Sequence, residues 1–149
     1  MLRRTRNRLC IWVIVGGLSN FLAYTIVYAG LGGDAKNGEK GSVINARGEA
    51  DEVFYIRGHF IHGSGGRSRE VSRAVWIYSY LHSISVWPTH GAMIISMLIL
   101  ARPHIIATMR ESNWIRGPTF ITVCITLTAL ACSVLTLWFS IHFVQDLLA

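Results

Sequence analysis

Three stretches of this chain contain no Asp, Glu, Lys or Arg, and they span residues 9–33, 74–101 and 117–145. A helix needs about 20 consecutive apolar residues to cross the hydrocarbon core of a bilayer, so each stretch is long enough to do so. Charged residues make up only 15% of the chain, against roughly 25% in a soluble domain. The sequence therefore predicts an all-α integral membrane protein. Its three transmembrane helices are expected at residues 9–32, 75–101 and 118–146.

The basic residues are placed as in a membrane protein and not as in a nucleic-acid-binding protein. The formal charge is +6, but four of the fourteen basic residues lie in the first eight positions. Helices without a basic face offer nothing to a nucleic acid, so we expect the lipid bilayer and no nucleic acid as partner. The segment 102–117 also carries three arginines against one acid. By the positive-inside rule both segments are expected in the cytoplasm. The protein is expected in a bacterial inner membrane, with its N-terminus on the cytoplasmic side.

Residues 33–74 form a long connection that we expect outside the membrane. Nine glycines from Gly32 to Gly66 argue against a compact core, so the prediction is a Gly-rich loop within a single membrane domain covering residues 1–149. Residues 53–56 have the pattern of a short strand, which is expected to pair back with residues 60–61.

Two motifs in this connection resemble ligand sites only superficially. His59 and His62 lie near two carboxylates, but a structural zinc site needs four ligands at a recognised spacing, so solvated histidines explain them better. The glycine-rich run 63–68 lacks the Lys-Ser/Thr pair of a phosphate loop, and Ser68 is explained as an ordinary helix cap. The sequence therefore predicts no metal site.

Small and polar residues recur along one face of the first and third helices. Such stripes let neighbouring helices approach closely, and a 3.5-residue period predicts a left-handed helix–helix contact. An amide near the middle of the membrane, such as that of Asn20, also needs a hydrogen-bond partner. The predicted helix-packing residues are Gly16, Asn20 and Ala23 in the first helix, and Thr122, Thr126, Ala129, Ser133, Thr136 and Ser140 in the third.

Three histidines in the apolar stretches are the candidate cofactor-binding residues: His82, His90 and His142. An ionisable residue inside a membrane is a functional candidate by default, and two imidazoles facing each other can ligate a b-type haem. His90 lies roughly 12 Å from His82 along the helix, where it can contact a quinone. The alternative interpretation is that these side chains simply form hydrogen bonds between helices. Haem b and quinone are therefore the two cofactors considered.

Three hypotheses for the function remain open on the sequence alone. The first is a non-catalytic accessory or anchor subunit of a respiratory or photosynthetic electron-transfer complex, docked on other membrane subunits or on itself as a homo-oligomer. The second is a small membrane enzyme that acts on a lipid-soluble substrate through His82 and His90. The third is an oligomer that conducts protons or solutes along the face from Ser79 to Ser96. A polar face closed by protein favours the first, a wide pocket around His82 the second, and a continuous wet path the third.

Overall fold

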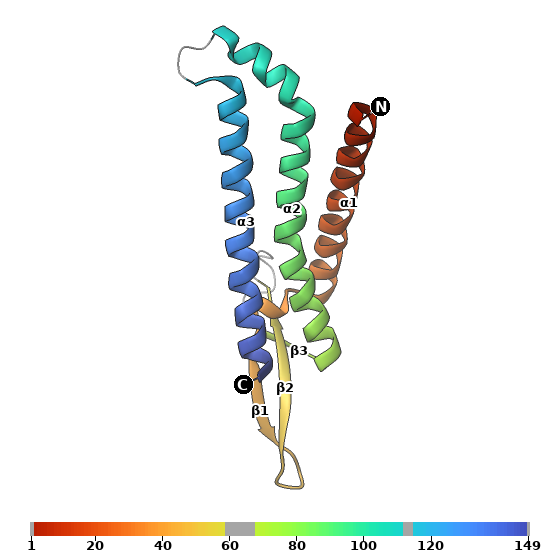
Figure 1. Cartoon of the computed structure of the whole chain (residues 1–149). Coiled ribbons are helices and arrows are strands. Elements are labelled where there is room, and N and C mark those ends of the chain that lie inside the picture. Colours follow the sequence, from red (N-terminus) through yellow and green to blue (C-terminus); the bar gives the residue numbers. More distant parts are fainter. Residues whose placement is uncertain (1, 59–67, 112–114, 149) are drawn as a thin grey trace. The chain divides into compact units, whose positions relative to one another are not determined.

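The computed structural model describes residues 2–58, 68–111 and 115–148 of the chain. The described residues are mostly helical, and three of the helices are long and apolar enough to cross a membrane (Figure 1). These helices are α1 (Leu2–Leu31), α2 (Arg73–Thr108) and α3 (Gly117–Leu148). The prediction of three potential membrane-spanning helices is confirmed.

The second helix is longer than expected. We expected it to end before Arg102 and Pro103, but α2 continues through both residues to Thr108 and is followed by the short 3₁₀ helix η2 (Met109–Glu111). A proline inside a helix removes one backbone hydrogen bond without ending the helix when the neighbouring turns are intact. The connection from α2 to α3 is correspondingly shorter than residues 102–117.

The described part of the connection between α1 and α2 contains a small antiparallel sheet with buried residues, so the prediction of a Gly-rich loop without a compact core is wrong for this part. After the 3₁₀ helix η1 (Ala35–Asn37) come the strands β1 (Lys40–Ile44), β2 (Ala50–Arg57) and β3 (Ser68–Val71), in the order β1-β2-β3. The strand pairing places Phe54 of β2 opposite Lys40 of β1 on one side and Val71 of β3 on the other. The predicted strand at residues 53–56 is confirmed as part of β2.

Several sequence predictions fall outside the described residues. These are the pairing of residues 60–61 with β2, the histidines His59 and His62, and most of the glycine-rich run at residues 63–68. The sheet that is described pairs β2 with β1 and β3.

The buried apolar core of the sheet region joins the strands to the helices. Its members are Ala35, Phe54, Ile56, Trp76 and Tyr80. Two glycines bring the backbone close to β2, because a Cβ on Gly33 would meet the backbone of Arg57 and a Cβ on Gly38 would meet the carbonyl of Tyr55. At these positions glycine allows close approach of two backbones and does not mark an open loop.

The chain divides into two compact units, which we describe separately. Unit 1 comprises Met1–Asn20 and Val86–Trp138, and unit 2 comprises Phe21–Ser85 and Phe139–Ala149. Unit 1 is helical in its described residues. Unit 2 contains the sheet together with the end of α1, the start of α2 and the end of α3 (Figure 1).

Candidate functional site

A buried carboxylate is the centre of the polar side chains in unit 2. Asp34 directly follows the glycine pair that ends α1, and only 4% of its surface is exposed. Its backbone is fixed by two hydrogen bonds with Arg57, in which the Asp34 amide donates over 3.2 Å and the Asp34 carbonyl accepts over 3.1 Å. The segment that follows α1 is thereby attached to the end of β2, the middle strand of the sheet.

The carboxylate of Asp34 accepts hydrogen bonds from α1 and η1 and lies close to a hydroxyl of α2. The Tyr24 hydroxyl on α1 donates to Oδ2 over 2.7 Å, and the backbone amide and side-chain amide of Asn37 in η1 donate to Oδ1 over 3.1 and 2.8 Å. The Ser83 hydroxyl on α2 lies 3.4 Å from Oδ2 but only 3.0 Å from the Ser79 carbonyl. A hydroxyl has one proton to donate, so the shorter bond to Ser79 is the better one.

A second contact joins η1 to α2 directly. The backbone amide of Ala35 donates to the Ser79 hydroxyl over 3.1 Å, and both residues are buried. Because its carboxylate accepts from α1 and η1 and the next residue bonds to α2, Asp34 is placed to hold the three segments together. We refer to Tyr24, Asp34, Asn37, Ser79 and Ser83 as the Asp34 cluster.

His82 lies beside the Asp34 cluster, between two aromatic rings. The ring centroids of Tyr24 and Tyr78 each lie 5.5 Å from the imidazole centroid, at edge-on angles of 78° and 61°. Its Nδ1 is buried and has no hydrogen-bond partner among the described residues. The aromatic contacts place His82 in a packed environment within unit 2.

An aromatic group lies next to the sheet, at the start of α2 and the end of α3. The Trp76 ring packs against Phe54 of β2, Tyr80 of α2 and Phe143 of α3, with centroid distances of 5.6, 5.2 and 6.2 Å. The Tyr80 hydroxyl donates to the Asp146 carboxylate over 3.1 Å. Among the described side chains the Trp76 Nε1 is buried without a hydrogen-bond partner.

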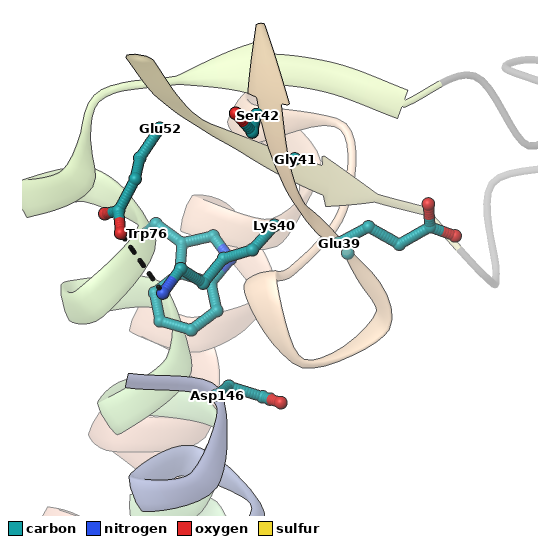
Figure 2. Close-up of a pocket in the computed structure, with 8 residues that line it drawn as sticks. Glu39, Lys40, Gly41, Ser42, Glu52, Trp76 and Asp146 are labelled. Atoms are coloured by element: carbon teal, nitrogen blue, oxygen red, sulfur yellow. Dashed lines mark ion pairs between the residues drawn. The ribbon is translucent and has the colours of Figure 1, made fainter. Parts of the chain in front are cut away.

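The aromatic group borders a polar pocket of about 570 Å³ (Figure 2). One ion pair crosses it, between Lys40 Nζ and Glu52 Oε1 at 3.8 Å. The glutamate side chain is 57% exposed, so solvent weakens this pair and it contributes little to stability. The lining residues are Gly38, Glu39, Lys40, Gly41, Ser42, Glu52, Trp76 and Asp146.

In unit 1, Asn20 and His90 have hydrogen-bond partners on α2. The Asn20 side-chain amide donates to the Thr89 hydroxyl over 3.2 Å, which supplies the partner that an amide in an apolar helix requires. His90 Nδ1 lies 2.8 Å from the carbonyl of Val86, one turn earlier in the same helix. Because a carbonyl only accepts, the tautomer of His90 in this bond carries its proton on Nδ1.

The remaining predicted packing residues are largely exposed within this chain. In α1, Gly16 and Ala23 are exposed and Gly17 is buried. In α3 the last two residues of the stripe, Thr136 and Ser140, are half-buried. The other four are exposed: Thr122, Thr126, Ala129 and Ser133. Their packing role, and the cofactor role of His82, His90 and the exposed His142, stay predictions.

A groove of about 540 Å³ runs beside the α3 stripe in unit 1. Helices α2 and α3 approach closely at Gly91 of α2, where an added Cβ would lie 2.8 Å from the Sγ atom of Cys132 in α3. The groove is lined mostly by small and apolar residues: Pro88, Gly91, Ala92 and Ile95 of α2, and Ala129, Cys132, Ser133, Thr136 and Leu137 of α3.

The described residues contain no group of three or more His, Cys, Asp or Glu side chains that could hold a metal ion. Comparison with protein families, curated proteins and solved structures returns no match to this chain. The fold therefore defines a class only: a chain with three helices apolar enough to cross a membrane and a small sheet between the first two.

Sequence reasoning missed the Asp34 cluster and the aromatic group. One signal for Asp34 was present, because it is the first charged residue after the charge-free stretch 9–33 and follows two glycines. No comparable signal identified Trp76 as a contact of Phe54 and Phe143, since these residues are far apart in the sequence.

Proposed function

We propose that this chain is a non-catalytic accessory or anchor subunit of a larger membrane complex, of the kind that carries out respiratory or photosynthetic electron transfer. One observation carries the proposal: four of the six residues of the small-residue stripe of α3 are exposed, so the described residues of unit 1 do not cover them. These four are Thr122, Thr126, Ala129 and Ser133. Large apolar residues of the same helix, such as Leu127 and Leu130, are exposed beside them.

The exposed stripe is suited to contact a helix of another membrane subunit. Small residues let two helix backbones approach closely, and close packing is a main source of helix association in lipid. The Thr122 and Thr136 hydroxyls donate to carbonyls one turn earlier in α3, over 3.0 and 2.7 Å. Because these hydroxyls are satisfied by their own helix, a partner helix need not supply hydrogen bonds to them.

The polar face of α2 also favours an accessory subunit over a channel. In unit 1 this face is closed by α1, where Asn20 bonds to Thr89 and Gly17 packs on Met93. In unit 2 Ser79 is 3% exposed and bonds to Ala35. A face engaged by protein at these positions offers no water path along them.

A pair of neighbouring substitutions tests the proposal. Ala129→Phe fills the groove side of the stripe, whereas Leu130→Phe changes the adjacent position, which is 58% exposed. We expect the wild-type chain, purified in mild detergent, to have a native mass above that of its monomer. Ala129→Phe should release the partner and Leu130→Phe should retain it. A monomeric wild type, or equal effects of the two substitutions, would contradict an accessory role through this face.

The same experiment separates another subunit from a second copy. Two differently tagged versions of the chain are expressed together, and the native mass is compared with that of the chain alone. A complex containing both tags indicates a homo-oligomer, and a complex with one tag and additional subunits indicates the proposed anchor role. Either complex should respond to Ala129→Phe.

A second candidate function is contact of His82 with a haem or a quinone, or with the substrate of a small membrane enzyme. The buried Nδ1 without a partner among the described residues favours it, because a buried polar atom is normally satisfied. A dithionite-reduced minus oxidised spectrum of the purified protein tests the haem. Sharp reduced-haem bands that disappear in His82→Ala would support this candidate, and a colourless protein would remove haem from it.

A further inference from the structure

A second pocket of unit 1 is lined by arginines and lies at the end where α1 begins. Its volume is about 680 Å³, and its lining residues are Arg3 and Arg6 of α1 with Arg102, Pro103 and Ile106 of α2. Arg3 and Arg6 are three residues apart on a helix, so they lie on the same face. Three positive charges from two helices thus converge on one pocket.

Among the described residues, no carboxylate lines this pocket to balance the three charges. The sequence has no Asp or Glu before Asp34, and none from Val71 to Arg110. Three guanidinium groups held near one another repel, so an anion between them is electrostatically favoured. The planar guanidinium donates two parallel hydrogen bonds to phosphate or carboxylate, and it suits a phosphate with several acceptor oxygens.

One wall of the pocket is apolar, and apolar helix surface continues from it. Pro103 and Ile106 form this wall, while Leu9 and Trp12 are 65% and 72% exposed further along α1. The charge-free stretches of both helices come close to the pocket in sequence. The stretch in α1 begins at residue 9, and the stretch in α2 ends at residue 101. Tryptophan near such a boundary is typical of the membrane–water interface.

We propose that this pocket binds the phosphate headgroup of an anionic phospholipid, with Arg3, Arg6 and Arg102 as donors. The acyl chains of the lipid follow the apolar wall into the bilayer. Basic pockets between transmembrane helices are a known form of lipid headgroup recognition, and here the charge and the apolar wall occur together. The proposal is independent of the accessory role, since it concerns different residues.

Two double substitutions on the same helix provide the test. Arg3→Gln with Arg6→Gln removes two charges that line the pocket, and Arg4→Gln with Arg8→Gln removes two charges from the same segment that do not line it. The full chain is purified in mixed micelles of detergent, phosphatidylcholine and phosphatidylglycerol, and bound lipid is counted by native mass spectrometry. Circular dichroism checks that each variant keeps its helical content.

The wild type should retain phosphatidylglycerol in preference to phosphatidylcholine. The pocket variant should bind it more than about 100-fold more weakly, as expected for two lost hydrogen bonds to a charged group. The control variant should bind it at most about 30-fold more weakly, the effect of losing two basic residues near an anionic surface. A second pair, Arg102→Gln against Arg110→Gln, should show the same contrast from α2 if the first pair fails to fold.

Three outcomes would overturn the proposal. The first is equal loss of phosphatidylglycerol in the pocket and control variants, which indicates general attraction to negative charge. The second is a wild type with no preference between the two lipids. The third is full displacement of the lipid by millimolar inorganic phosphate, because the pocket would then be a site for a free anion and not for a lipid.

Discussion

The two units of this chain hold their helices together by different interactions. In unit 1 the contacts are close approaches at small residues, such as Gly17 to Met93 and Gly91 to Cys132, with one hydrogen bond between the Asn20 and Thr89 side chains. In unit 2 the contacts are large aromatic rings and a buried carboxylate. The close approaches in unit 1 are of the kind expected for helices in lipid, which gain little from burying apolar surface and depend on close packing.

Unit 2 resembles the interior of a soluble protein more closely. Its sheet and helix ends bury Ile56 completely and Trp76 to 2% exposure. Burial of large apolar side chains stabilises a folded region through the hydrophobic effect wherever the unfolded region is exposed to water. Substitutions in unit 2 should therefore have larger effects on stability than substitutions in unit 1.

Trp76→Ala should give the largest effect. It removes ring contacts with Phe54, Tyr80 and Phe143 and leaves a cavity, so the free energy of unfolding should fall by about 3–5 kcal/mol. The measurement is unfolding by sodium dodecyl sulfate in mixed micelles, followed by far-ultraviolet circular dichroism. Trp12→Ala, at a position 72% exposed on α1, is the control and should change stability by less than about 0.5 kcal/mol. Equal losses would remove the contrast between the units.

Asp34→Ala should give the next largest effect. It leaves the Tyr24 hydroxyl and the Asn37 amide without their acceptor in a buried region, at a cost of about 1 kcal/mol or more for each donor. The expected loss of about 2–3 kcal/mol is measured by the same unfolding experiment. Asp51→Ala in β2 is the control, because Asp51 is exposed and should change stability by less than about 0.5 kcal/mol. Full stability of Asp34→Ala would show that the Asp34 cluster does not hold unit 2 together.

These two residues also show what the sequence could and could not predict. The three apolar helices were predictable, because long charge-free stretches are a local property. The Asp34 cluster depends on hydrogen bonds between residues as far apart as 35 and 79, and nothing in the local pattern sets that pairing. The same holds for Asn20: its need for a partner was predictable, but the choice of Thr89 was not.

The sheet was only partly predictable for a related reason. β2 has the apolar residues of a strand, with Phe54 and Ile56 buried, whereas β1 and β3 are short and contain no buried residue. Such segments become strands by pairing with β2, and pairing is a long-range property. The glycines were misinterpreted because the sequence does not distinguish a flexible glycine from one that allows a close backbone contact, as Gly38 does beside Tyr55.

Gly17→Leu tests the close packing in unit 1. A Cβ at Gly17 would already meet the Met93 side chain, so a leucine should lower stability by about 1–2 kcal/mol, reduced by the flexibility of methionine. Gly16→Leu is a matched control on the next residue, where nothing lies within 4 Å of an added Cβ. We expect Gly16→Leu to leave the unfolding of the isolated chain unchanged or slightly improved, since leucine favours a helix over glycine. The reverse order of effects would contradict the packing of α1 on α2.

The smallest predicted effect is a pH dependence that belongs to unit 2. Both lysines of the chain are in this unit, and Lys36 Nζ lies 3.6 Å from the centroid of the Phe139 ring. Partial burial lowers the pKa of Lys36, and the nearby Asp34 carboxylate opposes that change. Between this lowered pKa and the ordinary lysine value, the unfolded chain binds more protons than the folded chain, so stability should rise with pH.

Lys36→Gln should remove this dependence. The measurement compares unfolding midpoints of wild type and variant at pH 8 and pH 10.5, where the wild type should gain slightly more stability with pH than the variant does. Arg47→Gln is the control, because it removes an exposed positive charge from the same unit and arginine does not titrate in this range. An identical pH dependence in wild type and Lys36→Gln would contradict the prediction. The folded and unfolded chains would then bind the same number of protons at Lys36. The contact with Phe139 would leave this lysine as solvated as it is in the unfolded chain.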